Sequence, residues 1–284
     1  MKCLHLPCFL WPCILVISAS PSLWAQAAGL VAGASNEARQ PVLELFFTNR
    51  LQQLPLTNVR VPYDSVYERE KHYEGVGFYQ ALTNMMPTSS GLPEDGVVLF
   101  LCNDGYNPAV PLKTLIREHA FLAMADHDAP KGSHWLPIKS GGLKELGPWY
   151  LVWPESSGPS PNHPWPYGVI GVRIASRQSL FGPAMPLLQA HQRGFELYSK
   201  SCMTCHSING VGGTLGPDLN YPKNVYEYWQ PAQLISYVQD PSKFRLNAKM
   251  PSFASLGEEN IVAILDYVKH MQGHKVVPNI GGKK

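Results

Sequence analysis

Apolar positions in the C-terminal third of the chain recur at the three- and four-residue spacing of a helix. The first pattern consists of Leu187, Leu188, His191, Phe195, Tyr198 and Cys202. The second lies near the end of the chain and consists of Ile261, Ile264, Leu265, Val268 and Met271. One apolar face on each segment predicts two amphipathic helices that pack against other parts of a small domain.

Other residues in the sequence indicate where the second helix starts and where the two helices cross. Ser255 with Glu258 is typical of a capping box at a helix start. Gly194 lies inside the first helix, where glycine costs about 1 kcal/mol relative to alanine. Close approach by another helix is the usual reason to accept that cost. We therefore expect Tyr267 to lie over Gly194 and Phe195.

Residues 41–180 carry shorter apolar runs that are more typical of strands. The strand candidates are 97–102, 149–153 and 168–174, and the helix candidates are 73–82 and the segment that follows Pro111. Residues 103–105, Asn-Asp-Gly, predict a turn after the first of these strands. These elements predict a fold class of an α+β N-terminal domain followed by an all-α C-terminal domain.

Glycine and proline mark where the two domains meet. The segment 154–166 is too rich in proline for a helix or a central strand. Phe181-Gly182-Pro183 and Pro186 mark the boundary itself. We therefore expect the α+β domain at 41–180 and the C-terminal domain at 187–273.

Composition excludes one class of partner. The chain has 284 residues, of which 45% are hydrophobic and 15% charged, and its formal net charge is +2. This near-neutral balance, without a basic run, gives no support to nucleic-acid binding.

The first residues are typical of an export signal. Lys2 precedes an apolar stretch at 9–17, and small residues follow as far as Ala27. This pattern predicts a signal peptide at 1–27, with cleavage after Ala25 or Ala27. The apolar stretch is too short for a stable membrane span, and an uncleaved anchor is the alternative. Cleavage would leave three cysteines, Cys102, Cys202 and Cys205, and no structural disulfide is expected.

The strongest chemical signal is the pentapeptide Cys202-Met203-Thr204-Cys205-His206. Two thiols at this spacing can each add to one vinyl group of a haem, and the adjacent histidine then binds the iron. A bare Cys-x-x-Cys also occurs in redox dithiols and zinc sites, but the histidine weakens both alternatives. We therefore predict one covalent haem c on Cys202 and Cys205, with His206 as an axial ligand. Covalent haem and export together predict a periplasmic protein.

The C-terminal domain resembles the class I cytochromes c over about 187–273. The matching elements beside the pentapeptide are Gly194-Phe195, Gly216-Pro217-Asp218-Leu219, Lys249-Met250-Pro251 and the final helix. The resemblance implies that Met250 is the sixth ligand of the iron. It also implies that the carbonyl of Pro217 accepts a hydrogen bond from the ring of His206, which would fix the ring.

Ligation by His206 and Met250 would leave no open position on the iron, so the domain is expected to carry electrons rather than to catalyse a reaction. A basic ring at the haem edge, which would steer an acidic redox partner, has these candidates: Lys223, Lys243, Arg245 and Lys249. An ordinary solvated loop explains the same residues equally well.

The N-terminal domain resembles the last part of the molybdopterin domain of sulfite-oxidase-type enzymes. The matching segments are Asp104-Gly105-Tyr106, Pro111-Leu112, 148–154 and 167–174. That family carries a molybdenum-binding cysteine well before the Asp-Gly-Tyr element, and here no cysteine lies between the leader and Cys102. The resemblance therefore implies a reduced relative without metal, retained for binding or docking.

A separate candidate for a transition-metal site is the group His119, Asp126, His127, Asp128 and His134. These residues have no fixed helical spacing, which favours surface histidines and a turn.

Two classes of function remain. The first is a single-haem electron carrier, not itself an enzyme, between a periplasmic dehydrogenase or respiratory complex and an acceptor. Its N-terminal domain would dock a redox protein partner. The alternative is a haem-containing molybdenum sulfite dehydrogenase, or a subunit of one, and the missing cysteine favours the carrier. Association with a membrane is expected only through a partner or an uncleaved leader.

Overall fold

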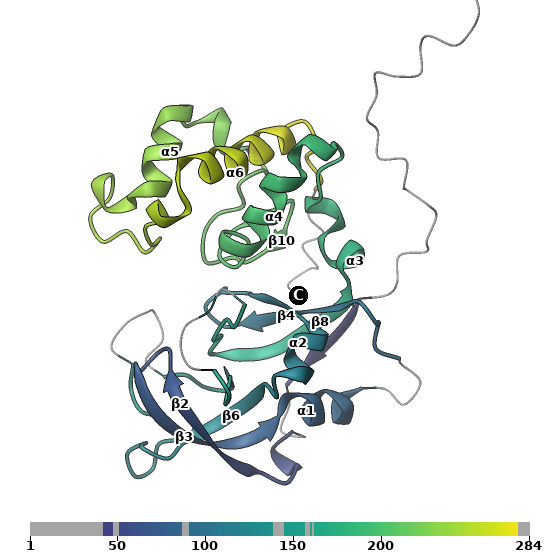
Figure 1. The fold of residues 1–284 in the computed structure, drawn as a ribbon, viewed down its shortest axis with the longest axis vertical. Coiled ribbons are helices and arrows are strands. Elements are labelled where there is room, and N and C mark those ends of the chain that lie inside the picture. Colours follow the sequence, from purple (N-terminus) through teal and green to yellow (C-terminus); the bar gives the residue numbers. More distant parts are fainter. Residues whose placement is uncertain are drawn as a thin grey trace, which may run out of the picture.

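The computed structural model describes residues 42–47, 51–86, 91–138, 145–156, 160 and 162–277. The predicted signal peptide at 1–27 lies outside these residues. Within them, no helix has both the length and the apolar character that crossing a membrane requires. Figure 1 shows two parts, with the sheets of the N-terminal part below the helices of the C-terminal part. Each part has its own cluster of buried apolar side chains.

Two antiparallel four-stranded sheets form the N-terminal part (Figure 1). The first has the order β1 (Leu43–Phe46), β8 (Val169–Ser176), β4 (Gly96–Cys102) and β5 (Ala109–Pro111). The second has the order β2 (Thr57–Asp64), β3 (Arg69–Gly77), β6 (Phe121–Asp126) and β7 (Tyr150–Val152). Strands β4, β7 and β8 lie where strands were predicted, and their apolar runs are mainly buried.

Short helices complete this part: η1 (Leu51–Gln53), α1 (Phe78–Met85) and α2 (Leu112–Arg117). Helix α2 begins directly after Pro111, as predicted. Proline suits that position because the first N–H groups of a helix have no partner within it.

The predicted helix at 73–82 is wrong in its first half. Residues 73–77 complete β3, which pairs with both β2 and β6. Lys71 and Tyr73 are buried while His72 between them is exposed, which is the two-residue alternation of a strand. Gly75 permits the pairing with β6, because a Cβ there would lie 2.1 Å from the carbonyl oxygen of Leu122.

The second sheet encloses ionised side chains. Lys71 Nζ lies 2.7 Å from Asp126 Oδ1 and 2.7 Å from Asp128 Oδ2, and the side chains of Lys71 and Asp126 are fully buried. Asp64 accepts a hydrogen bond of 2.7 Å from the hydroxyl of Tyr73. These contacts connect β2, β3 and β6 through their side chains as well as their backbones.

Helices α4 (Gln192–Ser201) and α6 (Glu258–Met271) cross at the centre of the C-terminal part. A Cβ on Gly194 would lie 2.2 Å from the carbonyl oxygen of Ala263, so only glycine allows this approach. The rings of Phe195 and Tyr267 lie 5.6 Å apart between centroids. Both helices and the expected contact of Tyr267 are therefore confirmed. The first helix begins only at Gln192, however, and Leu187 and Leu188, which were predicted on its apolar face, precede it and are 60% and 43% exposed.

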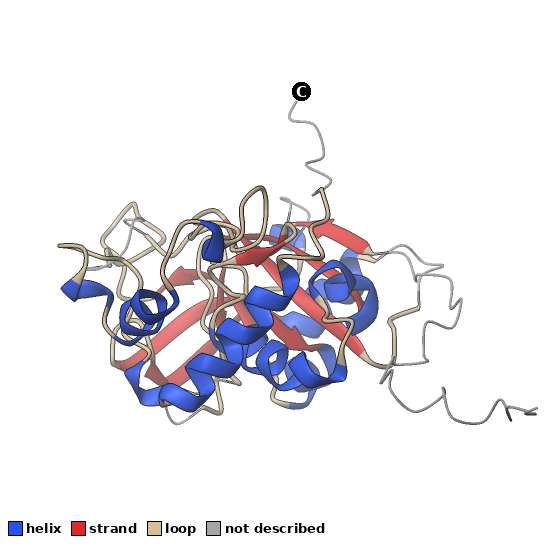
Figure 2. Cartoon of the chain, turned by 90° about the horizontal axis from the view of Figure 1, so that it is seen from above, coloured by secondary structure: helices blue, strands red, loops and turns tan. Residues whose placement is uncertain are grey.

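Shorter helices surround this crossing and, seen from above, lie over the strands of the sheets (Figure 2). They are α3 (Arg177–Phe181), η2 (Gly182–Ala184), η3 (Gln189–His191), η4 (Val225–Glu227), α5 (Pro231–Gln239), η5 (Pro241–Lys243) and η6 (Ala254–Leu256). The capping box predicted for α6 is wrong. Ser255 belongs to η6, and the cap is Gly257, whose φ of 78° turns the chain into α6 without a side-chain hydrogen bond.

The prediction of an all-α C-terminal domain is wrong, because a β-hairpin follows the pentapeptide. Strand β9 (Ser207–Ile208) pairs antiparallel with β10 (Val211–Gly212). The two residues between them, Asn209 and Gly210, have φ angles of 55° and 77°. Asn-Gly is the pair that a tight two-residue hairpin favours, because both positions need positive φ. The chain is therefore not an all-α cytochrome of class I.

The two parts touch at the turn after β4. The backbone N–H of Asn107 donates to the carbonyl of Thr204 at 2.8 Å, and the carbonyl of Gly105 accepts from the N–H of Thr214 at 2.9 Å. Gly105 has a φ of 83°, and a Cβ there would lie 2.5 Å from Thr214 Oγ1. The turn of the N-terminal part thus lies directly against the pentapeptide and its following loop.

Candidate haem site

The pentapeptide follows directly after helix α4 and forms a tight turn. The N–H groups of Cys202 and Met203 both donate to the carbonyl of Tyr198, at 2.8 and 2.9 Å. The N–H groups of Cys205 and His206 both donate to the carbonyl of Cys202, at 3.1 and 2.9 Å. The backbone therefore holds both thiols and the imidazole on one compact turn at the end of a helix.

The ring of His206 is oriented by the loop that follows the hairpin. Its Nδ1 lies 2.8 Å from the carbonyl oxygen of Pro217, the hydrogen bond that the family resemblance implied. Nδ1 is then the protonated nitrogen, and Nε2 is left for a metal. Burial lowers the pKa of His206, so the ring is neutral at pH 7 and Nε2 keeps its lone pair.

Glycines let this loop pack against the ring. A Cβ on Gly216 would lie 2.3 Å from His206 Cε1, and a Cβ on Gly213 would lie 2.0 Å from the carbonyl oxygen of Thr204. Any larger residue at either position would displace the imidazole or the cysteine turn. Gly216 belongs to the family element that the sequence already indicated, whereas Gly213 did not stand out there.

The two thiols suit covalent attachment better than dithiol chemistry. Burial, together with the charge of Cys205, raises the pKa of Cys202 to about 12, and burial also raises the pKa of Cys205. A reactive Cys-x-x-Cys dithiol needs the opposite shift. Among the described residues, no three His, Cys, Asp or Glu side chains are arranged to hold a metal ion. The pentapeptide therefore has the geometry of neither a redox dithiol nor a zinc site, and its donors fit haem.

A chain of buried amides fixes the loops around His206. Asn220 Nδ2 donates to Asn209 Oδ1 at 2.8 Å, and Asn224 Nδ2 donates to Asn220 Oδ1 at 2.8 Å. Asn209 Nδ2 also donates to Pro183 O, and Asn224 Nδ2 to Val268 O, both at 2.8 Å. The chain joins the hairpin, the loop after Pro217 and helix α6. No local pattern in the sequence indicates it, because its members come together only in the fold.

Met250 is half-buried on the segment between η5 and η6. Ser252 Oγ donates to the carbonyl of Gln239 at 2.6 Å, and the N–H of Phe253 donates to the carbonyl of Val238 at 3.1 Å. These bonds anchor the segment to the end of α5. The role of Met250 as sixth ligand stays a prediction.

The candidate basic ring is solvent-exposed at Lys223, Lys243, Arg245 and Lys249. Lys243 lies 3.5 Å from Asp240, an exposed pair that contributes little. Exposure suits both interpretations, a surface that steers a partner and an ordinary loop.

The separate candidate metal site is not assembled. Asp126 Oδ1 and Asp128 Oδ2 each form an ion pair with Lys71 Nζ, at 2.7 Å. His119 Nδ1 lies 2.9 Å from Glu155 Oε1, and His127 Nε2 lies 3.1 Å from Asn58 Oδ1. The histidines therefore take part in separate surface contacts.

Comparison with known proteins identifies the C-terminal region. A family model described as Cytochrome C oxidase, cbb3-type, subunit III matches residues 189–268, which include the pentapeptide, Pro217 and Met250. None of the curated proteins compared with the chain matches it. The match covers less than a third of the chain and gives no support to the molybdopterin-like interpretation of the N-terminal domain. Residues 189–268 form a cytochrome c domain, and such a domain binds haem.

Proposed function

We propose that the chain is a periplasmic single-haem c-type cytochrome that carries single electrons between a dehydrogenase or respiratory complex and an acceptor. The observation that carries this proposal is the orientation of His206. Its Nδ1 lies against the carbonyl oxygen of Pro217. Among the described residues its Nε2 has no hydrogen-bond partner, and it lies at the end of a two-cysteine turn inside a cytochrome c domain.

In this proposal Cys202 and Cys205 would hold the haem through thioether bonds, and His206 Nε2 would bind its iron. The haem would supply an iron that gains and loses one electron. Met250 would be the second protein ligand of the iron and would keep water and substrates away from the metal. A thioether ligand also favours Fe(II), which raises the reduction potential. These roles belong to a carrier rather than to an enzyme.

The N-terminal part serves in this proposal as a docking module without a redox centre of its own. Cys102 is the one cysteine between the predicted leader and the pentapeptide. It is 8% exposed, and burial raises its pKa, which disfavours the thiolate that a metal would need. A specific interface needs about 800 Å² on each partner, and the sheets beside the haem loop add surface to the domain.

Metal analysis and acid–acetone extraction of the purified protein test the proposal. We expect about one iron per chain, no stoichiometric molybdenum, and colour that stays with the polypeptide. Cys202→Ser combined with Cys205→Ser should abolish covalent haem. Cys102→Ser is the matched control, because it removes a thiol outside the pentapeptide and should leave the haem attached.

Haem that extracts freely from the native protein would contradict covalent attachment. Molybdenum in equal amount to iron would instead support the alternative, a haem-containing sulfite dehydrogenase or a subunit of one.

A further inference from the structure

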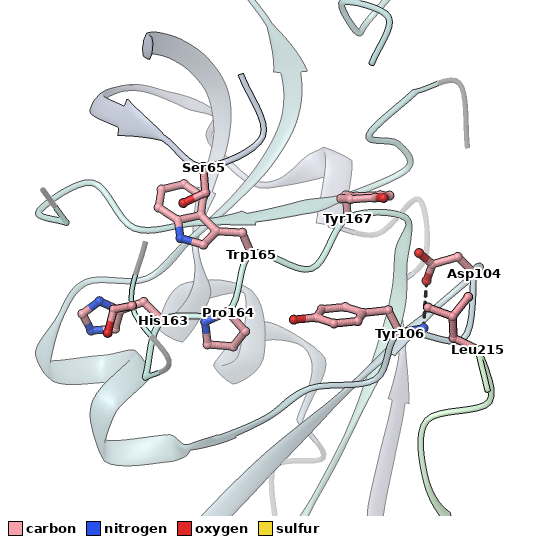
Figure 3. A pocket seen from close by; sticks show the side chains of 9 residues that line it. Ser65, Asp104, Tyr106, His163, Pro164, Trp165, Tyr167 and Leu215 are labelled. Atoms are coloured by element: carbon pink, nitrogen blue, oxygen red, sulfur yellow. Dashed lines mark hydrogen bonds between the residues drawn. The ribbon is translucent and has the colours of Figure 1, made fainter. Parts of the chain in front are cut away.

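A pocket of about 570 Å³ lies beside the turn through which the two parts touch. This volume is within the range of about 300–1,000 Å³ that small-molecule sites occupy. Figure 3 shows Ser65 and Trp165 at one end of the pocket and Asp104 with Leu215 at the other. Its walls therefore come from loops of the N-terminal part, including those that follow β2 and β4, and from the loop next to the pentapeptide.

Two buried polar atoms at the first end have no partner among the described residues. They are Trp165 Nε1 and Ser65 Oγ, and Trp165 is 8% exposed. Nearby Trp153, by contrast, donates its Nε1 hydrogen to the carbonyl of Pro164 at 2.8 Å. A buried donor left unpaired costs about 1–3 kcal/mol, so both groups are positioned to bind an oxygen that the protein itself does not supply.

The other end combines a carboxylate with aromatic rings. Asp104 Oδ1 accepts the backbone N–H of Tyr106 at 2.9 Å, and Tyr106 and Tyr167 lie beside it (Figure 3). Burial, followed by the charge of Asp104, raises the pKa of Tyr167, which keeps its hydroxyl protonated. A carboxylate with aromatic faces attracts organic cations.

The charge of the lining excludes other ligand classes. The described lining contains neither lysine nor arginine, and His163 is paired with Glu118. Among the described lining residues, Asp104 is thus the charged side chain that has no ion-pair partner. An anion such as sulfite, or a cofactor that carries a phosphate, would meet repulsion rather than a counter-ion.

We propose that this pocket binds an elongated organic cation that carries an oxygen acceptor at its other end. The cationic nitrogen lies against Asp104 and the rings of Tyr106 and Tyr167. The oxygen accepts hydrogen bonds from Trp165 Nε1 and Ser65 Oγ. This site is independent of the haem ligands and adds a ligand-binding function to the N-terminal part.

Binding at this site is coupled to the haem loop. Leu215 lines the pocket, and its N–H donates to the carbonyl of Gly105 at 3.3 Å. Asn107, the neighbour of Tyr106 in the same turn, donates its N–H to the carbonyl of Thr204 at 2.8 Å, so the turn that carries the Tyr106 ring lies against the attachment site. A bound cation repels Fe(III) more than Fe(II), so it raises the reduction potential, and by linkage the reduced protein binds the cation more tightly. This coupling, unlike the binding itself, rests on the proposed function.

Calorimetric titration of the full-length haem protein tests the site. The probe is a hydroxyalkyl cation, a trimethylammonium ion with a hydroxyl group at the end of a linear alkyl chain, used as a series of increasing chain length that begins with choline. The alkyl-trimethylammonium ion of the same length lacks the oxygen, the alcohol of the same length lacks the charge, and sulfite is an anion. We expect a hydroxyalkyl cation longer than choline to bind best, its alkyl counterpart about tenfold more weakly, and the alcohol and sulfite not at all.

Two variants separate the ends of the pocket. Asp104→Asn keeps an Oδ1 acceptor for Tyr106 while removing the charge, and it should weaken binding of the best hydroxyalkyl cation about 10- to 100-fold. Trp165→Phe keeps an aromatic ring and removes the donor, so it should weaken that cation about three- to tenfold and leave the binding of its alkyl counterpart unchanged. Asp95→Asn is the control, because Asp95 is an exposed carboxylate outside the pocket lining.

The absence of cation binding, equal binding of the neutral alcohol, or preference for sulfite would each overturn the site. Should Asp104→Asn fail to fold, Trp165→Phe with the four probes still decides between these outcomes. Binding of the hydroxyalkyl cation without a change in haem potential would refute only the coupling, and a protein without covalent haem that still binds this cation would refute only the proposed carrier.

Discussion

The two parts of the molecule bury polar groups in different ways. The N-terminal part encloses a charged network, in which Lys71 and Asp126 have fully buried side chains. The C-terminal part encloses neutral amides, the connected side chains of Asn209, Asn220 and Asn224. A buried charge is costly when its partner is removed, whereas a buried amide costs about as much as one or two unmade hydrogen bonds.

This difference reflects what each network holds in place. The charges connect strands that already share a sheet, so they act on the packing of the N-terminal part alone. The amides connect loops to helix α6 around His206 without adding charge beside its ring. We therefore expect damage to the first network to lower stability and leave the haem unaffected.

The largest expected effect comes from Lys71→Met. It leaves Asp126 buried without a counter-ion and should destabilise the N-terminal part by about 3–5 kcal/mol. Arg60→Met is the matched control, because Arg60 pairs with Glu70 across the same two strands at 2.6 Å but is exposed. That loss should be at most about 1 kcal/mol. Hydrogen exchange resolved by segment checks both values, and equal losses would show that burial does not set the cost.

A smaller effect is expected at the crossing of α4 and α6. In Gly194→Ala the new Cβ would lie 2.2 Å from Ala263 O and 2.7 Å from Tyr267 Cβ, so the helices must move apart. We expect a loss of about 1–3 kcal/mol confined to the C-terminal part, measured by denaturant unfolding followed at the haem absorbance. Gly182→Ala is the control, since its nearest atom beyond the chain neighbours lies 3.7 Å away. A tolerated Gly194→Ala would mean that the crossing is loosely packed.

The parts also differ in how much of them the sequence predicts. The helices α4 and α6 and the contact of Tyr267 with Gly194 follow from local spacing, and all are confirmed. The hairpin after His206 has a local signal in Asn209-Gly210, which the prediction of an all-α domain did not take into account. The amide network has no such signal, because Asn209 and Asn220 meet only when two loops fold together.

Non-local pairing explains the error in the N-terminal part. Residues 73–77 have helix-compatible spacing when read alone, yet they pair with β2 on one side and β6 on the other. Their partners lie elsewhere in the chain, so no window of sequence contains the decisive contacts. The pocket beside Asp104 is of the same kind, since Ser65, Trp165 and Leu215 come from three distant segments.

The smallest effect on the fold, and the sharpest on the haem, is expected for Met250→Leu. The two side chains have similar volume, so stability should change by less than about 1.5 kcal/mol. The reduction potential should fall by an amount on the order of 0.1 V or more, within the range of about 0.8 V that axial ligands span. The weak sulfur-to-iron absorption of the oxidised protein should disappear.

Met203→Leu is the matched control, because Met203 lies inside the pentapeptide but is buried in the apolar core of the C-terminal part. Its replacement should leave the reduction potential and the spectrum unchanged. An unaltered potential in Met250→Leu would place the sixth ligand on another residue, and the anchored segment between η5 and η6 would then serve only the packing of the domain.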